Sequence, residues 1–126
     1  MHLAPAIPII RIFSEDKARE FYVDFLGFTV EWEHRFEDNF PLYMQVRRSD
    51  LVLHLSEHHG DATPGSAIFV PVREIESLHA ELQGKHYRFG KPGVETLPWG
   101  KVLETIDPFG NRIRFCESPQ SAGSIV

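Results

Sequence analysis

The hydrophobic pattern at the start of the chain predicts a strand followed by a helix. A β-branched run over residues 7–13 ends at Ser14, a residue type that commonly caps helix N-termini. Apolar residues then recur at the spacing of one helix face, at Ala18, Phe21, Tyr22 and Phe25. Gly27 follows, where a left-handed C-terminal cap is favoured, so the sequence predicts a helix of about three turns.

The remaining hydrophobic runs repeat this order of elements. Strands are predicted over residues 28–36, 42–47 and 51–58, then over 67–72, 87–89, 102–106 and 112–117. A second helix face is marked by Ile75, Leu78 and Leu82, and Gly84 ends it. Moving the second helix onto the first needs an offset of 57 residues, and moving residues 114–117 onto 54–57 needs 60. The chain is therefore interpreted as two copies of one β-α-β-β-β unit of roughly 50 residues.

The length of the chain, 126 residues, suits one domain with a modest core. Within this single domain, 1–126, we expect the first unit over about residues 5–58 and a connector over 59–66. The second unit is expected over about 67–117, followed by a loose tail over 118–126. The predicted fold class is α+β.

Composition and charge exclude several classes of protein. Hydrophobic residues make up 42% and charged residues 25% of the chain, values typical of globular and not of disordered proteins. The 18 acidic residues outnumber the 13 Lys and Arg residues, and the net charge of −5 without a basic stripe disfavours nucleic acid as a partner. No stretch approaches the roughly 20 apolar residues of a membrane span, and no basic leader precedes the first apolar run. A cytoplasmic location without membrane contact is expected.

Three stretches of the sequence carry a family resemblance: residues 12–28, Pro98-Trp99-Gly100, and residues 107–115, which begin Asp-Pro-Phe-Gly-Asn. Together they resemble the glyoxalase/bleomycin resistance protein/dioxygenase superfamily, also called the vicinal oxygen chelate fold, over about residues 5–118. The tryptophan of Pro-Trp-Gly, followed eight residues later by the Asp-Pro turn, is most similar to the small bleomycin-resistance proteins. The resemblance implies curved mixed sheets built from two βαβββ modules. It also implies a two-fold homodimer in which modules of both chains form two clefts.

The positions of metal ligands in this superfamily are not kept in the chain. Metal-using members have His, Gln or Glu ligands on the first and last strands of the two units, and by the resemblance these positions fall on Ile7, on Gly65 or Ser66, and on Arg114. A hydrocarbon, a glycine or hydroxyl, and a guanidinium do not assemble the donors that a divalent cation needs. We therefore expect no metal, no cofactor, no catalytic residue and none of the superfamily's metal-dependent isomerase, lyase or dioxygenase reactions.

A histidine-rich segment over residues 54–59 is a second candidate for metal binding. His54 and His58 share one strand face, but in a strand they are roughly 13 Å apart, too far to hold one ion. A metal site completed by Glu57 or Asp61 stays open as the minor alternative. The main interpretation places His54 in the lining of a pocket and His58 on an exposed loop.

Charged and aromatic positions predict a ligand-binding cleft. By alternation, Arg11 and Arg114 share inward faces with His54 and give the cleft a polar, partly cationic floor. Flat rings for stacking a planar ligand are expected from Trp32, Phe36, Phe40, Tyr43 and Trp99. Acidic groups that attract a cation are Glu31, Glu33, Glu37 and Asp38. The alternatives are a solvated strand edge for the acidic segment and ordinary packing for about half of the rings.

The single cysteine, Cys116, excludes an internal disulfide framework. Its position late in a predicted strand is typical of a small buried hydrophobe, because nothing in the sequence indicates an activated thiolate. We therefore do not count it as a nucleophile.

Two classes of function remain. The first hypothesis is a metal-free protein that binds and sequesters a bleomycin-type antibiotic, or a similar planar cationic small molecule, without changing it and so confers resistance. The second is a glyoxalase-type lyase or isomerase that acts on a small anionic metabolite held by Arg11 and Arg114. A third possibility is a dimer whose small-molecule ligand is undefined.

Overall fold

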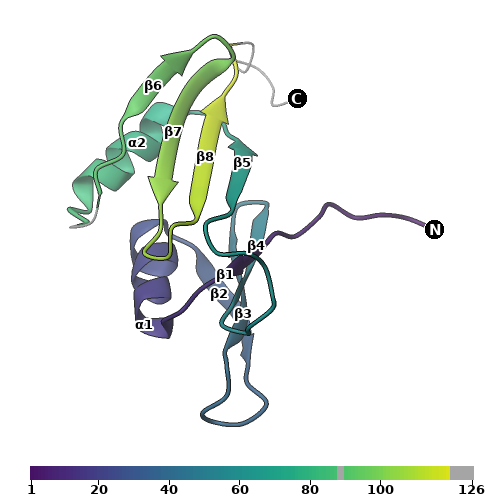
Figure 1. The fold of residues 1–126 in the computed structure, drawn as a ribbon. Helices are drawn as coiled ribbons and strands as arrows, with labels where there is room; N and C mark the ends of the chain where they lie inside the picture. The colour runs from purple at the N-terminus through teal and green to yellow at the C-terminus, as the bar shows by residue number, and fades with distance from the viewer. Residues whose placement is uncertain (88–89, 120–126) are drawn as a thin grey trace. The chain divides into compact units, whose positions relative to one another are not determined.

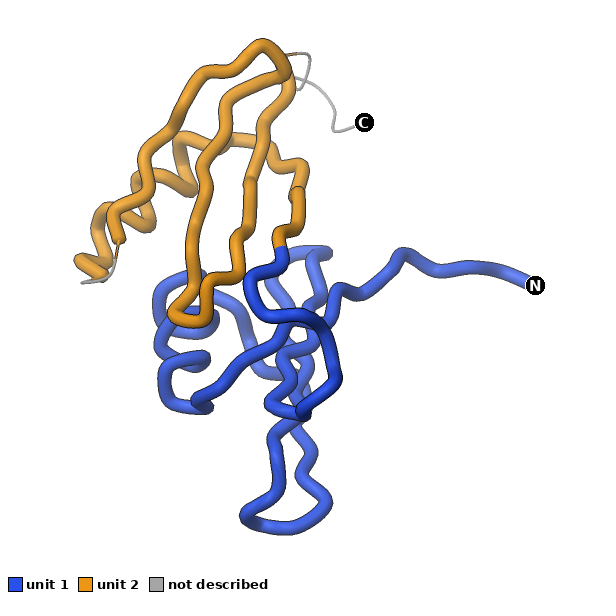
Figure 2. Tube along the Cα trace, in the orientation of Figure 1, with its two compact units in different colours: residues 1–66 blue, residues 67–126 orange. Residues whose placement is uncertain are grey.

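The order of strands and helices is the same in both halves of the chain. The computed structural model describes residues 1–87 and 90–119. It divides into unit 1, residues 1–66, and unit 2, which begins at Ala67, as the two colours of Figure 2 show. Each unit contains one four-stranded sheet with both parallel and antiparallel pairs. The predicted α+β class and the two βαβββ modules are confirmed.

The sheet of unit 1 has the strand order β1-β4-β3-β2. Its strands are β1 (Ile9–Arg11), β2 (Thr29–His34), β3 (Tyr43–Arg48) and β4 (Leu51–Ser56), labelled in Figure 1. β1 lies parallel to β4, and the other neighbours are antiparallel. The first strand after the helix, β2, is therefore at the edge of the sheet, farthest from β1.

The helical segment between β1 and β2 begins and ends where the sequence predicts. α1 (Glu15–Ala18) is capped by Ser14, whose hydroxyl oxygen accepts a hydrogen bond from the amide of Lys17 at 3.3 Å. It continues as η1 (Arg19–Phe25), a π-helical stretch in which amides reach five residues back, as Leu26 N does to Phe21 O at 2.9 Å. Gly27 then adopts φ 77°, which confirms the left-handed stop.

The two faces of the unit 1 sheet differ in character. Strand residues on one face are buried with the apolar side chains of the helical segment; they are Ile10, Met44, Val46, Leu53 and Leu55. Because successive side chains point to opposite faces, Tyr43, Gln45 and His54 lie on the other face. That second face is only partly covered within the unit, since Trp32 on it is 43% exposed.

A bulge in β2 brings Trp32 to this second face. Val30 pairs with Val46, but Trp32 pairs with Gln45 in place of Met44, because Glu31 is an extra residue on its strand. In a regular ladder Trp32 would lie opposite Met44 and face the buried side. The next residue, Glu33, takes that position and pairs with Met44.

Unit 2 repeats the topology of unit 1, with the order β5-β8-β7-β6. Its elements are β5 (Ala67–Pro71), α2 (Ile75–Gly84), β6 (Val94–Leu97), β7 (Gly100–Ile106) and β8 (Arg112–Glu117). Ile9 pairs with His54 in unit 1 and Phe69 pairs with Arg114 in unit 2. Both differences in number, 69 − 9 and 114 − 54, equal 60, so the pairing agrees with the predicted offset of the repeat.

The strand predicted over residues 87–89 falls mostly outside the described residues, which exclude Arg88 and Phe89, and Tyr87 itself is not in a strand. The strand that pairs with β7 is β6. The sequence did not predict β6, which is joined to β7 by the short turn at Pro98 and Trp99. The predicted tail lies outside the described residues from position 120 onward.

No helix within the described ranges is both long and apolar enough to cross a membrane.

The turn between β7 and β8 is held by one buried carboxylate. Asp107 Oδ1 accepts hydrogen bonds from the amides of Phe109 and Asn111, both at 2.8 Å. Its Oδ2 accepts a third from Asn111 Nδ2, also at 2.8 Å. Asp107 is 5% exposed and Asn111 is 2% exposed, so these donors have little access to water. The turn therefore fixes where β8 begins.

We expect Asp107→Ala to lower the free energy of unfolding by about 3 kcal/mol, because three donors lose a charged acceptor. Urea denaturation followed by circular dichroism measures the change. Asp50→Ala, in the exposed turn between β3 and β4, is the control and is expected to change stability by less than about 0.5 kcal/mol. Equal shifts of the two midpoints would contradict the role given to Asp107.

Candidate functional site

Aromatic and histidine rings gather on the second face of the unit 1 sheet. The rings of Trp32 and Tyr43 are nearly parallel, with an interplanar angle of 11° and centroids 6.0 Å apart. His54 meets both rings with its edge, at centroid distances of 5.3 Å from Trp32 and 5.1 Å from Tyr43. Three rings from three strands thus form one partly exposed surface.

A chain of hydrogen bonds holds this aromatic surface in place. The hydroxyl of Tyr43 lies 2.6 Å from His54 Nδ1, and His54 Nε2 lies 2.8 Å from Gln45 Oε1. Gln45 Nε2 donates to Glu31 Oε1 at 2.8 Å, and Arg47 Nε donates to Glu31 Oε2 at 3.0 Å. Since each side chain is bonded to the next, the rings of Tyr43 and His54 are fixed before any ligand arrives.

The protonation states follow from this environment. Burial lowers the pKa of His54, so the imidazole is neutral at pH 7. Hydrogen bonds from Gln45 and then Arg47 lower the pKa of the Glu31 carboxyl. Burial, and after it the negative charge of Asp61, raises the pKa of the Tyr43 phenol. The chain therefore connects a neutral phenol and a neutral imidazole to an ionised carboxylate.

A pocket of about 360 Å³ opens beside the aromatic surface. Its lining residues are Trp32, His34, Phe36, Tyr43, His58 and Asp61. Phe36 is 71% exposed and meets the rings of His34 and His58 edge-on, at centroid distances of 4.8 and 6.3 Å. Asp61 is held in position by the buried hydroxyl of Ser56, which donates to Asp61 Oδ2 at 2.8 Å. We call this the unit 1 pocket.

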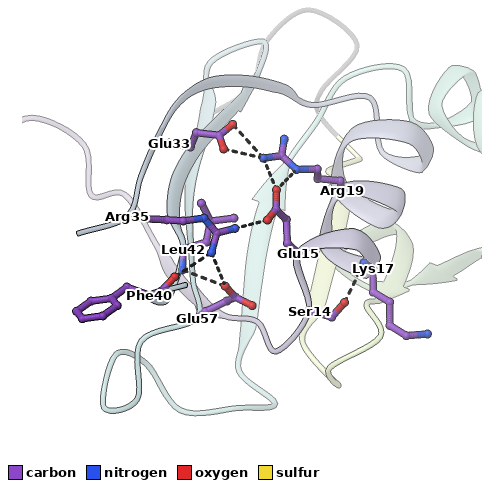
Figure 3. Close-up of polar contacts among 9 residues, drawn as sticks. All are labelled: Ser14, Glu15, Lys17, Arg19, Glu33, Arg35, Phe40, Leu42 and Glu57. Atoms are coloured by element: carbon purple, nitrogen blue, oxygen red, sulfur yellow. Dashed lines mark hydrogen bonds and ion pairs between the residues drawn. The ribbon is translucent and has the colours of Figure 1, made fainter. Parts of the chain in front are cut away.

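The acidic segment predicted to attract a cation is largely bound to arginines. Figure 3 shows Glu33 facing Arg19 of the helix, with hydrogen bonds of 3.0 and 2.9 Å. Arg19 and Arg35 both contact the carboxylate of Glu15, and Arg35 also lies 3.8 Å from Glu57 Oε1. The structure therefore does not bring Glu33 to the aromatic surface.

Phe40 and Asp38 lie in a different recess, of about 510 Å³, on the loop between β2 and β3. Arg35, Pro41 and Glu57 also line it, and Arg35 Nη1 donates to the carbonyl oxygen of Phe40 at 2.8 Å. The ring of Phe40 is exposed. The prediction that Phe40 and Asp38 contact a ligand thus concerns a second place within unit 1.

Trp99 and Arg114 lie together in unit 2, in a recess of about 490 Å³. The other residues that line it are Phe69, Gly93, Glu95, Leu97, Val102 and Glu104. Trp99 and Phe69 are each 58% exposed, and Arg114 Nε donates to Glu104 Oε2 at 2.7 Å. The guanidinium of Arg114 is therefore paired with a carboxylate.

The local backbone explains the exposure of Trp99. Gly100 has φ 144°, and a Cβ added there would overlap the carbonyl oxygen of Glu117 on the neighbouring strand. Only glycine fits this close approach, which ends the short turn at Pro98 and Trp99. The bulky residue of Pro-Trp-Gly therefore stands in the turn, away from the close contact.

Arg11 is already engaged by protein groups. Its guanidinium donates to the carbonyl oxygen of His58 and lies over the ring of Phe13, 4.6 Å from the centroid. The positive charge predicted for the floor of the cleft is thus directed at a backbone oxygen and a ring.

Sequence reasoning did not single out several residues of these sites as ligand contacts. They are Gln45, Phe69 and Glu104, and Asp61 was considered only as a group that completes a metal site. Gln45 is two residues from Tyr43 and shares its strand face, and Phe69 is the repeat partner of Ile9, so alternation and the offset of 60 were the available signals. For Asp61, in the connector, the sequence offered no periodic signal.

Residues 1–87 and 90–119 contain no group of three His, Cys, Asp or Glu side chains placed to hold a metal ion. Cys116 is buried, and burial raises the pKa of its thiol.

Comparison with known proteins gives the family. A family model described as glyoxalase superfamily protein matches residues 1–122. No curated protein sequence gave a significant match.

Solved structures share the fold. A bleomycin-binding protein complexed with bleomycin has a TM-score of 0.68 and 21% identity, over 92% of this chain and 99% of that chain. The bleomycin-binding protein from Streptomyces verticillus, complexed with copper(II)-bleomycin, has a TM-score of 0.67 and 26% identity, over 94% and 98%. TnmS3, an antibiotic binding protein from Streptomyces sp. CB03234, has a TM-score of 0.66 and 23% identity, over 93% and 99%. With the family match over residues 1–122, the chain belongs to the glyoxalase superfamily.

Proposed function

We propose that this protein binds a planar, cationic small molecule of the bleomycin class and releases it chemically unchanged. The observation that carries the proposal is the pair of nearly parallel rings, Trp32 and Tyr43, in which Tyr43 is hydrogen-bonded to His54 and through it to Gln45. A flat aromatic surface that is half-exposed and fixed in advance loses little entropy when a planar ligand stacks on it. Trp99 and Phe69 are two further exposed rings, which line one recess in unit 2.

The comparisons support a binding function. Three solved proteins of the same fold carry bleomycin-binding or antibiotic-binding in their descriptions. At identities of 21–26% this similarity supports the class of function, and the ligand of this chain is our proposal. Sequestration of an antibiotic in the cytoplasm would confer resistance to it.

The residues at the expected metal-ligand positions support binding without chemistry. Ile7 offers only a hydrocarbon, and Arg114 offers a guanidinium already paired with Glu104 at 2.7 Å. The rival hypothesis, an enzyme acting on an anion, needs Arg11 and Arg114 to receive that anion. Both guanidiniums have protein partners, so an anion would have to compete with Glu104 or with the carbonyl of His58.

We also propose that the working form is a homodimer, as the family resemblance implies. Each unit, taken by itself, has exposed rings on its sheet, Trp32 in unit 1 and Phe69 in unit 2, and a second chain is the simplest source of cover for a large ligand. Light scattering would then give twice the chain mass of 14.5 kDa.

Isothermal titration calorimetry with metal-free bleomycin tests the binding proposal. We expect a dissociation constant of about micromolar or below, and Trp32→Ala should weaken binding by about 1–3 kcal/mol because the stacking face is lost. Trp32→Phe keeps a flat ring and is expected to retain most of the affinity. Trp99→Ala reports on unit 2 in the same way. Absence of heat at high bleomycin concentration would refute the proposal.

Chemical inertness is checked separately. After long incubation with the protein, bleomycin is expected to be recovered with unchanged mass, whether or not zinc, nickel, manganese or iron was added. Elemental analysis of the purified protein is expected to show none of these metals at a stoichiometric level. A modified drug, or tight stoichiometric binding of one metal, would favour the enzyme hypothesis instead.

A further inference from the structure

Beside the unit 1 pocket, hydrogen bonds link Tyr43, His54, Gln45 and Glu31 in that order. The Glu31 carboxylate at the end of this series determines the direction of each bond. The Glu31 carboxylate has only acceptors, so the side chain of Gln45 must turn its NH₂ group toward it, at 2.8 Å. The other end of the amide, Oε1, then faces His54 Nε2 at 2.8 Å. Because an amide oxygen only accepts, Nε2 must carry the imidazole proton.

This order sets the role of Tyr43. With the proton of a neutral imidazole on Nε2, the Nδ1 of His54 carries a lone pair and accepts from the Tyr43 hydroxyl at 2.6 Å. The phenol proton is therefore used inside the protein. Toward a ligand in the pocket, the Tyr43 oxygen can therefore act only as a hydrogen-bond acceptor.

Asp61 adds a second acceptor to the same pocket. Its carboxylate is fixed by the hydroxyl of Ser56 at 2.8 Å, and its negative charge contributes to the raised pKa of Tyr43, so the two groups act on the same space. Within the described ranges, 1–87 and 90–119, no ion pair involves Asp61. Among the described residues that line the pocket it is the one carboxylate.

The walls of the pocket are aromatic. Trp32, Phe36 and Tyr43 line it, and ring faces attract positive charge through their quadrupoles. Aromatic walls, together with the two oxygen acceptors of Tyr43 and Asp61, suit a group that is both positive and rich in N–H donors.

We propose that the unit 1 pocket binds a protonated amine or amidine, with N–H donors directed to the Tyr43 oxygen and the Asp61 carboxylate and the charge lying against the rings of Trp32 and Phe36. This inference rests on the proposed function and deepens it, because it names the part of the ligand that this pocket recognises. In this proposal the carboxylate that attracts the cation is Asp61, in place of the acidic residues predicted in β2. There, Glu31 and Glu33 are bound by Arg47 and Arg19.

Three small probes test the proposal on the full chain. Benzylammonium has charge and N–H donors, benzyltrimethylammonium has charge without N–H donors, and benzyl alcohol has neither charge nor N–H. In titrations followed by ¹H–¹⁵N correlation spectra, including the indole signal of Trp32, benzylammonium is expected to bind about tenfold more tightly than either of the others. Equal affinities of the two cations would overturn the proposal.

Two variants locate the acceptors. Asp61→Asn is expected to weaken benzylammonium binding about tenfold, because the amide removes the charge that the N–H donors meet. Asp50→Asn makes the same change of net charge in the exposed turn between β3 and β4 and is the matched control, expected to leave the affinity unchanged. Tyr43→Phe keeps the ring and should remove most of the preference for benzylammonium over benzyltrimethylammonium. Equal effects of Asp61→Asn and Asp50→Asn, with Tyr43→Phe retaining the preference, would exclude the assigned acceptors.

The results separate this proposal from the proposed function. If bleomycin binds but benzylammonium shows no preference and Asp61→Asn binds bleomycin as the wild type does, the site of the cation is wrong and the binding function stands. If benzylammonium binds as expected but bleomycin does not, the pocket is correctly assigned and the antibiotic is not the ligand.

Acid pH is expected to weaken benzylammonium binding. Protonation of His54 puts a proton on Nδ1, which then donates to Tyr43 and turns the hydroxyl toward the ligand as a donor. The pKa of His54 is lowered, so this loss occurs below its ordinary value of 6.5. The other titratable or charged side chains near the site are Glu31, Arg47, Asp61, His34, His58 and Arg11.

The pH effect is measured by repeating the titration from about pH 8 to about pH 5.5. Tyr43→Phe lacks the hydroxyl that reverses, so its affinity should fall less over this range. An affinity that stays constant or rises toward acid pH would contradict the hydrogen-bond directions derived above.

Discussion

The extra residue at Glu31 in β2 is the constraint on which the chemistry of unit 1 depends. It shifts Trp32 by one position, from the face buried with the helix to the face that carries Tyr43 and His54. It also leaves the Glu31 carboxylate where Gln45 and Arg47 reach it. One bulge therefore supplies both the exposed ring and the acceptor that sets the direction of the hydrogen bonds.

The two units show how one scaffold supports different chemistry at equivalent positions. His54 in unit 1 corresponds to Arg114 in unit 2, and each pairs with one residue of the neighbouring strand, Gln45 or Glu104. In unit 1, His54 and Gln45 form a neutral hydrogen bond that belongs to a longer series, whereas in unit 2 Arg114 and Glu104 form an ion pair. The backbone register is the same, so the difference lies in the side chains alone.

The sequence predicted the repeat because burial imposes a period on each element, and the ends of the first helix because Ser14 and Gly27 have strong local preferences. The aromatic candidates Trp32, Tyr43 and Trp99 were identifiable from residue type. The residues that these rings contact could not be predicted, because strand alternation without the bulge places Trp32 on the face buried with the helix. Ion pairs such as Glu33 with Arg19 join residues whose distance in the fold no local pattern encodes.

The close approach at Gly100 separates two structural roles within one hairpin. The backbone tolerates no side chain at that position, so the shape of the hairpin depends on a residue that has no side chain. The neighbouring residue, Trp99, is under less constraint, because its ring is mostly exposed and packs against few other side chains. A substitution at position 99 therefore changes the exposed surface of the hairpin and leaves the close approach at Gly100 in place.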